Sequence, residues 1–126
     1  MVKREQMNVL LIDDDRGFGK LLQDYFAATG LRLLLATDSD AALNILAEEQ
    51  VSAVLVDAQL GDSSMDGYDL CLHLREKLQI QVPIIMITGS LAAAAEGREA
   101  GANGWLTKPF FPEEILGLLN SLPSEQ

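Results

Sequence analysis

The sequence has one cysteine, few basic residues and no long apolar run. A lone Cys71 cannot form an internal disulfide or a cysteine-based metal cluster, so a reducing, cytoplasmic setting is expected. No apolar segment approaches the roughly 20 residues that span a bilayer, and the N-terminal MVKREQMN lacks the apolar stretch of a signal peptide. Nine basic against 19 acidic residues give a formal charge of −10, which repels phosphate backbones and anionic lipids. Direct binding of nucleic acid or of a membrane is therefore not expected.

The apolar segments that are present alternate with helical patterns. A chain of 126 residues, 48% of them hydrophobic, is long enough for one domain with a substantial core. Short segments without polar alternation predict buried strands at 9–12, 31–36, 51–56, 83–87 and 105–106. Helices are predicted at 16–28, after a cap at Asp38, Ser39 or Asp40, at 67–78, in the Ala-rich segment before the last strand, and from Pro112 onward. This order predicts an α/β fold, a single five-stranded parallel sheet with helices on both faces.

Reactive side chains gather at the carboxyl ends of the predicted strands, where doubly wound folds bind their ligands. These ends carry three acids, a hydroxyl and an ammonium, namely Asp13, Asp14, Asp57, Thr88 and Lys108. Carboxylates about 5 Å apart repel by roughly 3 kcal/mol per pair at an effective dielectric near 20. Clustered oxygens of this kind suit Mg²⁺ or Mn²⁺. The sequence therefore predicts a divalent-cation site at this edge of the sheet.

Five motifs stand in order along the chain: VLLIDDD, AVLVDAQL, MDGYDL, VPIIMITGS and AGANGWLTKPF. With them the sequence resembles the receiver domain of two-component response regulators, of the chemotaxis-regulator-like kind. The resemblance covers roughly residues 7–122 and leaves short extensions at 1–6 and 123–126. It implies a flavodoxin-like (βα)5 fold and a phosphorylation-activated switch rather than an enzyme. The implied partners are a sensor histidine kinase or a phosphotransfer protein, and an output domain or target that the sequence does not name.

The same resemblance implies a role for each residue at the strand ends. Asp57 is the expected phosphoacceptor, and Thr88 and Lys108 are expected to bind the phosphoryl group. Thr88 is also expected to act with Trp105 as a switch pair, although simple packing remains an alternative for Trp105. The expected metal ligands are Asp13, Asp14, Asp57 and the backbone carbonyl of Gln59. A cis peptide bond is expected between Lys108 and Pro109.

The sequence departs from the family pattern in two loops. Gly61 stands where a proline is usual, and the loop LGDSSMDG is about two residues longer than usual. The stretch from Thr88 to Trp105 is about two residues shorter. These departures leave open the shape of the helix between the fourth and fifth strands.

Several other polar residues have simpler interpretations. Asp15 is expected to cap a helix, and Asp62 and Asp66 to be solvated loop acids. His73 is expected to be structural or on the surface, and Cys71 to be a small buried hydrophobic residue.

Two other functions compete with a signalling switch. An Asp-nucleophile, Mg²⁺-dependent phosphohydrolase would place a D-x-D-x-T pattern at the first strand end, but Gly17 stands where the threonine belongs. A flavodoxin-like cofactor binder would carry a Ser-, Thr- or Gly-rich phosphate loop after the first strand, which this sequence lacks. The switch is the favoured interpretation.

Overall fold

The structure is a computed structural model that describes residues 7–89 and 91–121, with the side chains of 91–94 left out. Strands and helices alternate along the chain in the predicted order: β1 (Met7–Ile12), α1 (Arg16–Ala27), β2 (Leu31–Ala36), α2 (Ser39–Glu48), β3 (Ala53–Asp57), α3 (Gly67–Glu76), β4 (Ile84–Thr88), α4 (Leu91–Glu99), β5 (Gly104–Thr107) and α5 (Pro112–Ser121). Within the described part, no helix combines the length and apolarity needed to cross a bilayer. The extensions predicted at 1–6 and 123–126 lie outside the described residues.

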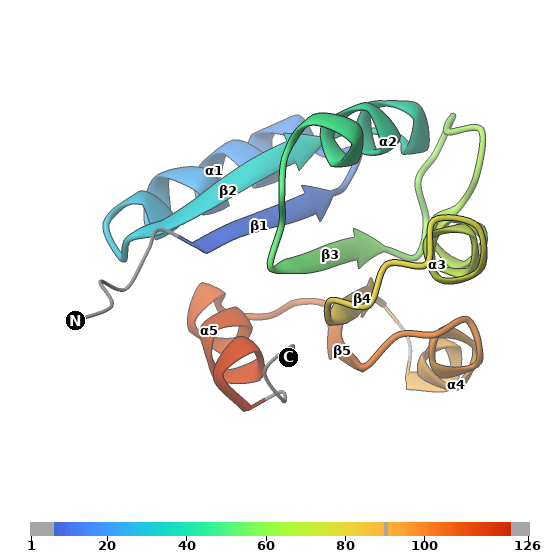
Figure 1. The fold of residues 1–126 in the computed structure, drawn as a ribbon. Coiled ribbons are helices and arrows are strands. Elements are labelled where there is room, and N and C mark those ends of the chain that lie inside the picture. Colours follow the sequence, from blue (N-terminus) through green and yellow to red (C-terminus); the bar gives the residue numbers. More distant parts are fainter. Residues whose placement is uncertain (1–6, 90, 122–126) are drawn as a thin grey trace.

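The five strands form one parallel sheet in the order β2-β1-β3-β4-β5. The arrows of β1, β2 and β3 in Figure 1 accordingly run in the same direction. This confirms the predicted fold class. The order reverses between β1 and β3, so the carboxyl ends of these two strands flank the point where ligands bind in doubly wound folds.

Helices cover both faces of the sheet and bury two separate apolar layers (Figure 1). On one face Phe26 of α1 and Ile115 of α5, both fully buried, pack against alternate strand residues. On the other face Ala42 of α2, with Leu70 and Leu74 of α3, packs against the remaining strand residues. Since both faces are covered, the strands are apolar throughout, which explains the lack of polar alternation in the sequence.

Some predicted boundaries are wrong by one to a few residues. β3 begins at Ala53 rather than Val51, because the ladder with β1 starts at the pair Val9–Ala53. β5 is longer than its two predicted residues, and α3 ends at Glu76 instead of residue 78. The early end of α3 has a backbone cause, since Gln79 adopts a φ of 55° and turns the chain out of the helix.

Aspartates cap the amino ends of three helices. Asp15, Asp38 and Asp66 each accept a hydrogen bond from the backbone N–H three residues further on, at 2.8 to 3.0 Å. Such N-caps satisfy donors that the first turn of a helix leaves unpaired. The predicted cap at Asp15 is confirmed, and Asp66 is a cap in addition to being an exposed loop acid. Cys71 is fully buried in the core, as predicted.

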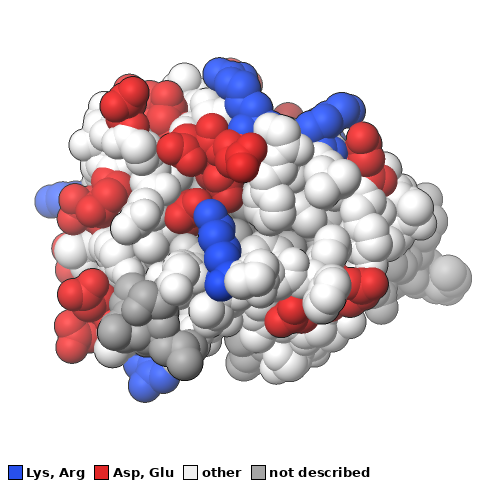
Figure 2. All heavy atoms as spheres, turned by 180° about the vertical axis from the view of Figure 1, so that it is seen from behind, with Lys and Arg blue, Asp and Glu red and all other residues white. Residues whose placement is uncertain are grey.

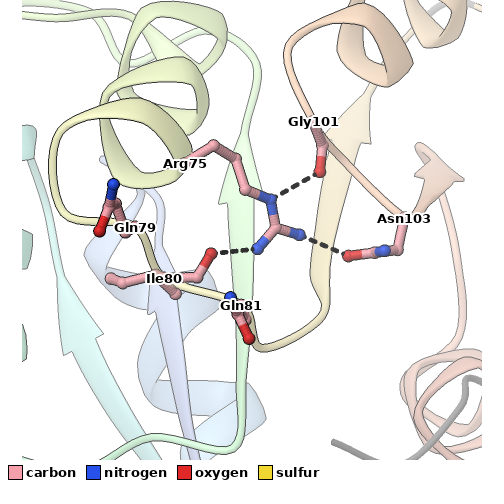
Figure 3. A pocket seen from close by; sticks show the side chains of 6 residues that line it. All are labelled: Arg75, Gln79, Ile80, Gln81, Gly101 and Asn103. Atoms are coloured by element: carbon pink, nitrogen blue, oxygen red, sulfur yellow. Dashed lines mark hydrogen bonds between the residues drawn. The ribbon is translucent and has the colours of Figure 1, made fainter.

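A half-buried arginine ties three segments together at the amino end of β4. Arg75 of α3 donates through Nη1 to the carbonyls of Ile80 (2.6 Å) and Val82 (2.9 Å), and through Nε to Gly101 (3.0 Å). Its Nη2 donates to Asn103 Oδ1 at 2.6 Å (Figure 3). The guanidinium thereby fixes the end of α3 and the loop between α4 and β5 to the start of β4.

We predict that Arg75→Met lowers the free energy of unfolding by about 2–3 kcal/mol, because three partly buried carbonyls lose a charged donor. Arg32→Met is the matched control, since Arg32 makes only an exposed ion pair with Glu49 at 3.4 Å. That control should cost no more than about 1 kcal/mol. Urea denaturation of both variants measures the difference, and equal losses would contradict an anchoring role for Arg75.

Candidate functional site

Four neighbouring strand ends converge on one small region, as the strand order requires. Asp13 directly follows β1, Asp57 ends β3, Thr88 ends β4 and Lys108 directly follows β5. The acids and the hydroxyl are buried, with exposures of 4% for Asp13, 6% for Asp57 and 4% for Thr88. The backbone holds these ends in register, because the N–H of Lys108 donates to the Thr88 carbonyl at 2.8 Å.

Three carboxylates lie close together at this edge. Asp13, Asp14 and Asp57 each offer an oxygen within 4.8 Å of the others, and Asp14 alone is exposed. At an effective dielectric near 20, such spacing costs roughly 3 kcal/mol for each ionised pair. Figure 2 shows acidic side chains gathered in the middle of one face of the molecule, with a basic side chain directly against them. The cluster therefore needs positive charge.

Lys108 supplies part of that charge. Its Nζ lies 2.7 Å from Asp57 Oδ2 and 4.0 Å from Asp13 Oδ2. Partial burial opposes the ammonium charge, but the hydrogen bond and charge of Asp57, with the charges of Asp13 and Asp14, outweigh it and raise the pKa of Lys108. Lys108 therefore stays protonated. One ammonium leaves the three carboxylates with two uncompensated charges.

Both oxygens of Asp57 are held in place. Oδ2 accepts from Lys108, and Oδ1 accepts from the backbone N–H of Gln59 at 2.9 Å. The carboxylate is thus fixed in orientation at the surface edge of a buried strand. The structure places Gln59 beside the acid, and the role of its carbonyl as a metal ligand stays a prediction.

Asp13 carries a buried oxygen that fits a cation. Its Oδ1 accepts from the Asp15 N–H at 2.9 Å, whereas its buried Oδ2 has no hydrogen-bond partner within the described residues. Burial, and secondarily the charge of Asp57, raises the pKa of the Asp13 carboxyl despite that backbone hydrogen bond. An open buried oxygen beside two more carboxylates is an all-oxygen donor set, the kind that Mg²⁺ and Mn²⁺ prefer.

A glycine is required where α3 begins. A Cβ added at Gly67 would collide with the backbone carbonyl of Asp57, which α3 approaches closely. The same approach lets the Gly67 N–H donate to the Ala58 carbonyl at 3.0 Å. The glycine of the MDG motif thus holds the start of α3 against the end of β3.

Tyr68 is a contact that the sequence did not indicate. Its side chain shares a hydrogen bond with Thr88 and packs against the core under α3. Burial, together with the nearby charge of Glu96, raises the pKa of the Tyr68 phenol. Nothing in the sequence marks Tyr68, because an aromatic residue in the first turn of a helix is most often ordinary packing.

Trp105 lies on β5 behind the cluster. The ladder between β4 and β5 pairs Met86 with Trp105 and Thr88 with Thr107, so Trp105 stands two residue pairs before the end of the ladder. Its half-buried ring packs against the core under α2 and α3. Gly97 of α4 lies against Met86 in the same layer, so α3 and α4 share this face of the sheet. The guanidinium of Arg98, on α4, lies 4.8 Å from the ring centroid, an arginine–tryptophan contact that the sequence did not indicate.

The cis peptide expected between Lys108 and Pro109 is confirmed.

The fold and site define an α/β protein with an acidic pocket and a lysine at the carboxyl edge of a parallel sheet. A family model, the response regulator receiver domain, matches residues 9–120, and the chain belongs to this family. Receiver domains bind Mg²⁺ at an acidic pocket of this kind.

Individual relatives agree with the family model. The chain is 34% identical to the transcriptional regulatory protein GltR of Pseudomonas aeruginosa, over 91% of this chain and 48% of that protein. Among solved structures, a putative response regulator from Chloroflexus aurantiacus superposes with a TM-score of 0.82 at 31% identity, covering 92% of this chain and 96% of that one. A response regulator from Burkholderia pseudomallei, described with a phosphorylated aspartic acid and a calcium ion, has the same TM-score and identity, covering 92% of this chain and 68% of that one. The chain spans about half the length of the curated relatives it matches.

We predict that Asp13→Asn stabilises the metal-free protein at neutral pH. In the folded wild type the raised pKa of Asp13 means that ionisation is unfavourable, so the cost is present above the folded pKa and disappears as the pH falls through it. The expected gain is a few degrees in Tm, the shift that about 1 kcal/mol produces in a domain of this size. Thermal unfolding in EDTA across pH 4 to 8 measures it, and a variant that melts below the wild type throughout would contradict the prediction.

Proposed function

We propose that this chain is a phosphorylation-activated signalling switch whose acceptor is Asp57. One observation carries the proposal. Lys108 and the Gln59 N–H hold the two Asp57 oxygens, and the buried Asp13 Oδ2, which has no hydrogen-bond partner among the described residues, lies in the same cluster. A carboxylate is already anionic at neutral pH, so it needs no general base to act as a nucleophile.

The proposed reaction is transfer of a phosphoryl group from a phosphohistidine. An Asp57 oxygen attacks phosphorus and the P–N bond breaks, leaving its electron pair on the imidazole nitrogen. Lys108 moves from Asp57 Oδ2 to a phosphoryl oxygen, and Thr88 binds another. Positioning and charge stabilisation account for most of the catalysis in phosphoryl transfer, and the contacts of Lys108 and Thr88 are of this type.

Mg²⁺ would be held by Asp13, Asp14, Asp57 and the Gln59 carbonyl. When bound, the ion supplies positive charge that neutralises the phosphoryl oxygens. The buried Asp13 Oδ2 supports this assignment, because it has no hydrogen-bond partner among the described residues. The Burkholderia pseudomallei relative, described with a phosphorylated aspartate and a divalent ion, supports the same pairing of acid and metal.

The proposed phosphoryl donor is a sensor histidine kinase or a phosphotransfer protein. Relatives such as GltR are named transcriptional regulators and are about twice as long as this chain. We propose that the output is carried by an additional domain or by a separate target protein.

The phosphohydrolase alternative gains no support from the local geometry. Its pattern needs a second aspartate, at Asp15, directed at the substrate. Asp15 instead accepts the Phe18 N–H at 3.0 Å as a helix cap and is exposed. Its side chain is therefore committed to α1.

Thr88 and Trp105 are the proposed switch pair. Met86 and Trp105 pack into the core on the α3 and α4 face, and residues two apart on a strand share a face, so Thr88 points to that side as well. A Thr88 that moves toward the phosphoryl group leaves the Tyr68 hydrogen bond and opens space on this face. Trp105 is the aromatic side chain positioned to respond, and Arg98 holds it in the phosphate-free arrangement.

Incubation with a small phosphodonor and Mg²⁺ should add one phosphoryl group to Asp57. Mass spectrometry should show the adduct, and hydroxylamine should remove it, as expected for an acyl phosphate. Asp57→Asn, which keeps the size of the side chain, should abolish it. A full-level adduct in that variant would move the acceptor elsewhere.

Trp105 fluorescence should report activation, because it is the only tryptophan in the chain. Beryllofluoride and Mg²⁺ together should shift its emission or its access to quencher, with no shift in Asp57→Asn and a reduced shift in Thr88→Ala. Arg98→Ala removes a cation–π contact worth about 0.5–1 kcal/mol, so about two- to fivefold less beryllofluoride should suffice. Unchanged emission and quenching in a demonstrably modified protein would favour a packing role for Trp105.

A further inference from the structure

The loop between β3 and α3, residues 58–66, is held in place at three alternate residues. The Gln59 N–H donates to Asp57 Oδ1, Gly61 lies against Asp14, and Ser63 bonds to Ser39. In Figure 1 this loop rises beside the amino end of α2 before α3 begins. The loop is held at the first two points by Asp57 and Asp14, which are proposed metal ligands, and at the third by Ser39 of α2. The loop therefore joins the site to α2.

Two serines bind the loop to α2. The backbone N–H of Ser39 donates to Ser63 Oγ at 2.8 Å, and Ser63 Oγ donates to Ser39 Oγ at 3.0 Å. The Met65 N–H also donates to Ser39 Oγ, at 3.2 Å. We call these three hydrogen bonds the serine clasp. Ser39 is fully buried and is the first residue of α2, so Ser63 satisfies an N–H that the helix itself leaves unpaired.

Gly61 sets the position of Asp14 from the other side. Its φ of +53° is a left-handed conformation that favours glycine, and a Cβ there would lie 2.5 Å from Asp14 Oδ2. The Asp14 carboxylate therefore rests directly over the Gly61 backbone. Asp14 is the exposed member of the acidic cluster and has the most room to move, so the loop backbone is the surface that limits it.

We propose that the serine clasp and Gly61 are positioning elements of the metal site. The serine clasp fixes the position of the long loop, so that the Gly61 backbone stays against the Asp14 carboxylate and the Gln59 N–H stays bonded to Asp57. This inference rests on the proposed metal-dependent switch function. It gives a role to the two features in which this loop departs from the family pattern, its extra length and the glycine at position 61.

Isothermal titration of Mg²⁺ into the protein tests the proposal without any phosphoryl transfer. Ser63→Ala and Gly61→Ala should each bind Mg²⁺ about tenfold more weakly than the wild type, the typical effect of losing a group that orients a ligand. Ser64→Ala is the matched loop control, because Ser64 is exposed and makes only a 3.5 Å contact with Asp40. Gly30→Ala is the matched backbone control, because Gly30 has a φ of +83° with nothing near its added Cβ. Both controls should stay within about twofold of the wild type.

Two further measurements separate positioning from general damage. Thermal unfolding in EDTA shows whether each variant is folded, and Ser63→Thr, which keeps the hydroxyl, should recover most of the affinity. In an Asp14→Asn background, Gly61→Ala should cause no additional loss, because its effect acts through Asp14. Wild-type affinity in both Ser63→Ala and Gly61→Ala would overturn the inference and leave the proposed function standing. Absence of Mg²⁺ binding by the wild type would overturn both.

Discussion

The parallel direction of β1, β3, β4 and β5 is the constraint on which the site depends. Because these strands end at one edge, any polar residue that follows them meets the others there, whatever its distance along the chain. Lys108 and Asp57 lie 51 positions apart in sequence, yet their side chains are 2.7 Å apart. The helices cover both faces of the sheet, so the partly buried charges lie at this edge, where they can meet solvent.

Without a bound cation, this cluster carries more negative than positive charge. Three carboxylates share one ammonium, and a buried Asp13 oxygen has no hydrogen-bond partner among the described residues. A buried charge without compensation costs stability and persists only when the surrounding structure holds it in place. Here the hydrogen-bonded strand ends and the close approach of Gly67 to Asp57 do so. In the proposed switch the same imbalance would make the site responsive, since a bound cation or an added phosphoryl group would change which oxygen Lys108 contacts.

The sequence predicted what depends on pattern and missed what depends on particular long-range contacts. Apolar runs and helical spacing predicted every element in order, and strand ends predicted the convergence of Asp13, Asp57 and Lys108. Helix ends were less predictable, because the positive φ of Gln79 is a conformation that its residue type does not favour. The bond between Ser39 and Ser63 joins two polar residues 24 positions apart, each of which looks like an ordinary turn or cap residue in sequence.

The two apolar layers lie on opposite faces of the sheet, so a change at the acidic edge can act on one layer without the other. Trp105 packs against the layer under α2, α3 and α4, which shares no buried residue with the one under α1 and α5. Thr88 points to the same face, because it lies two residues after Met86 on β4. Well-packed interiors do not deform continuously, so a displaced Thr88 is accommodated by discrete shifts of its nearest neighbours. Those neighbours are Tyr68 on α3 and, through Trp105, Arg98 on α4. At the opposite end of the sheet Arg75 fixes the loop that follows α4. Arg98 stands in the last turn of α4, three residues before Gly101, so in the proposed switch a displacement of Trp105 reaches α4 close to the point where Arg75 holds the chain.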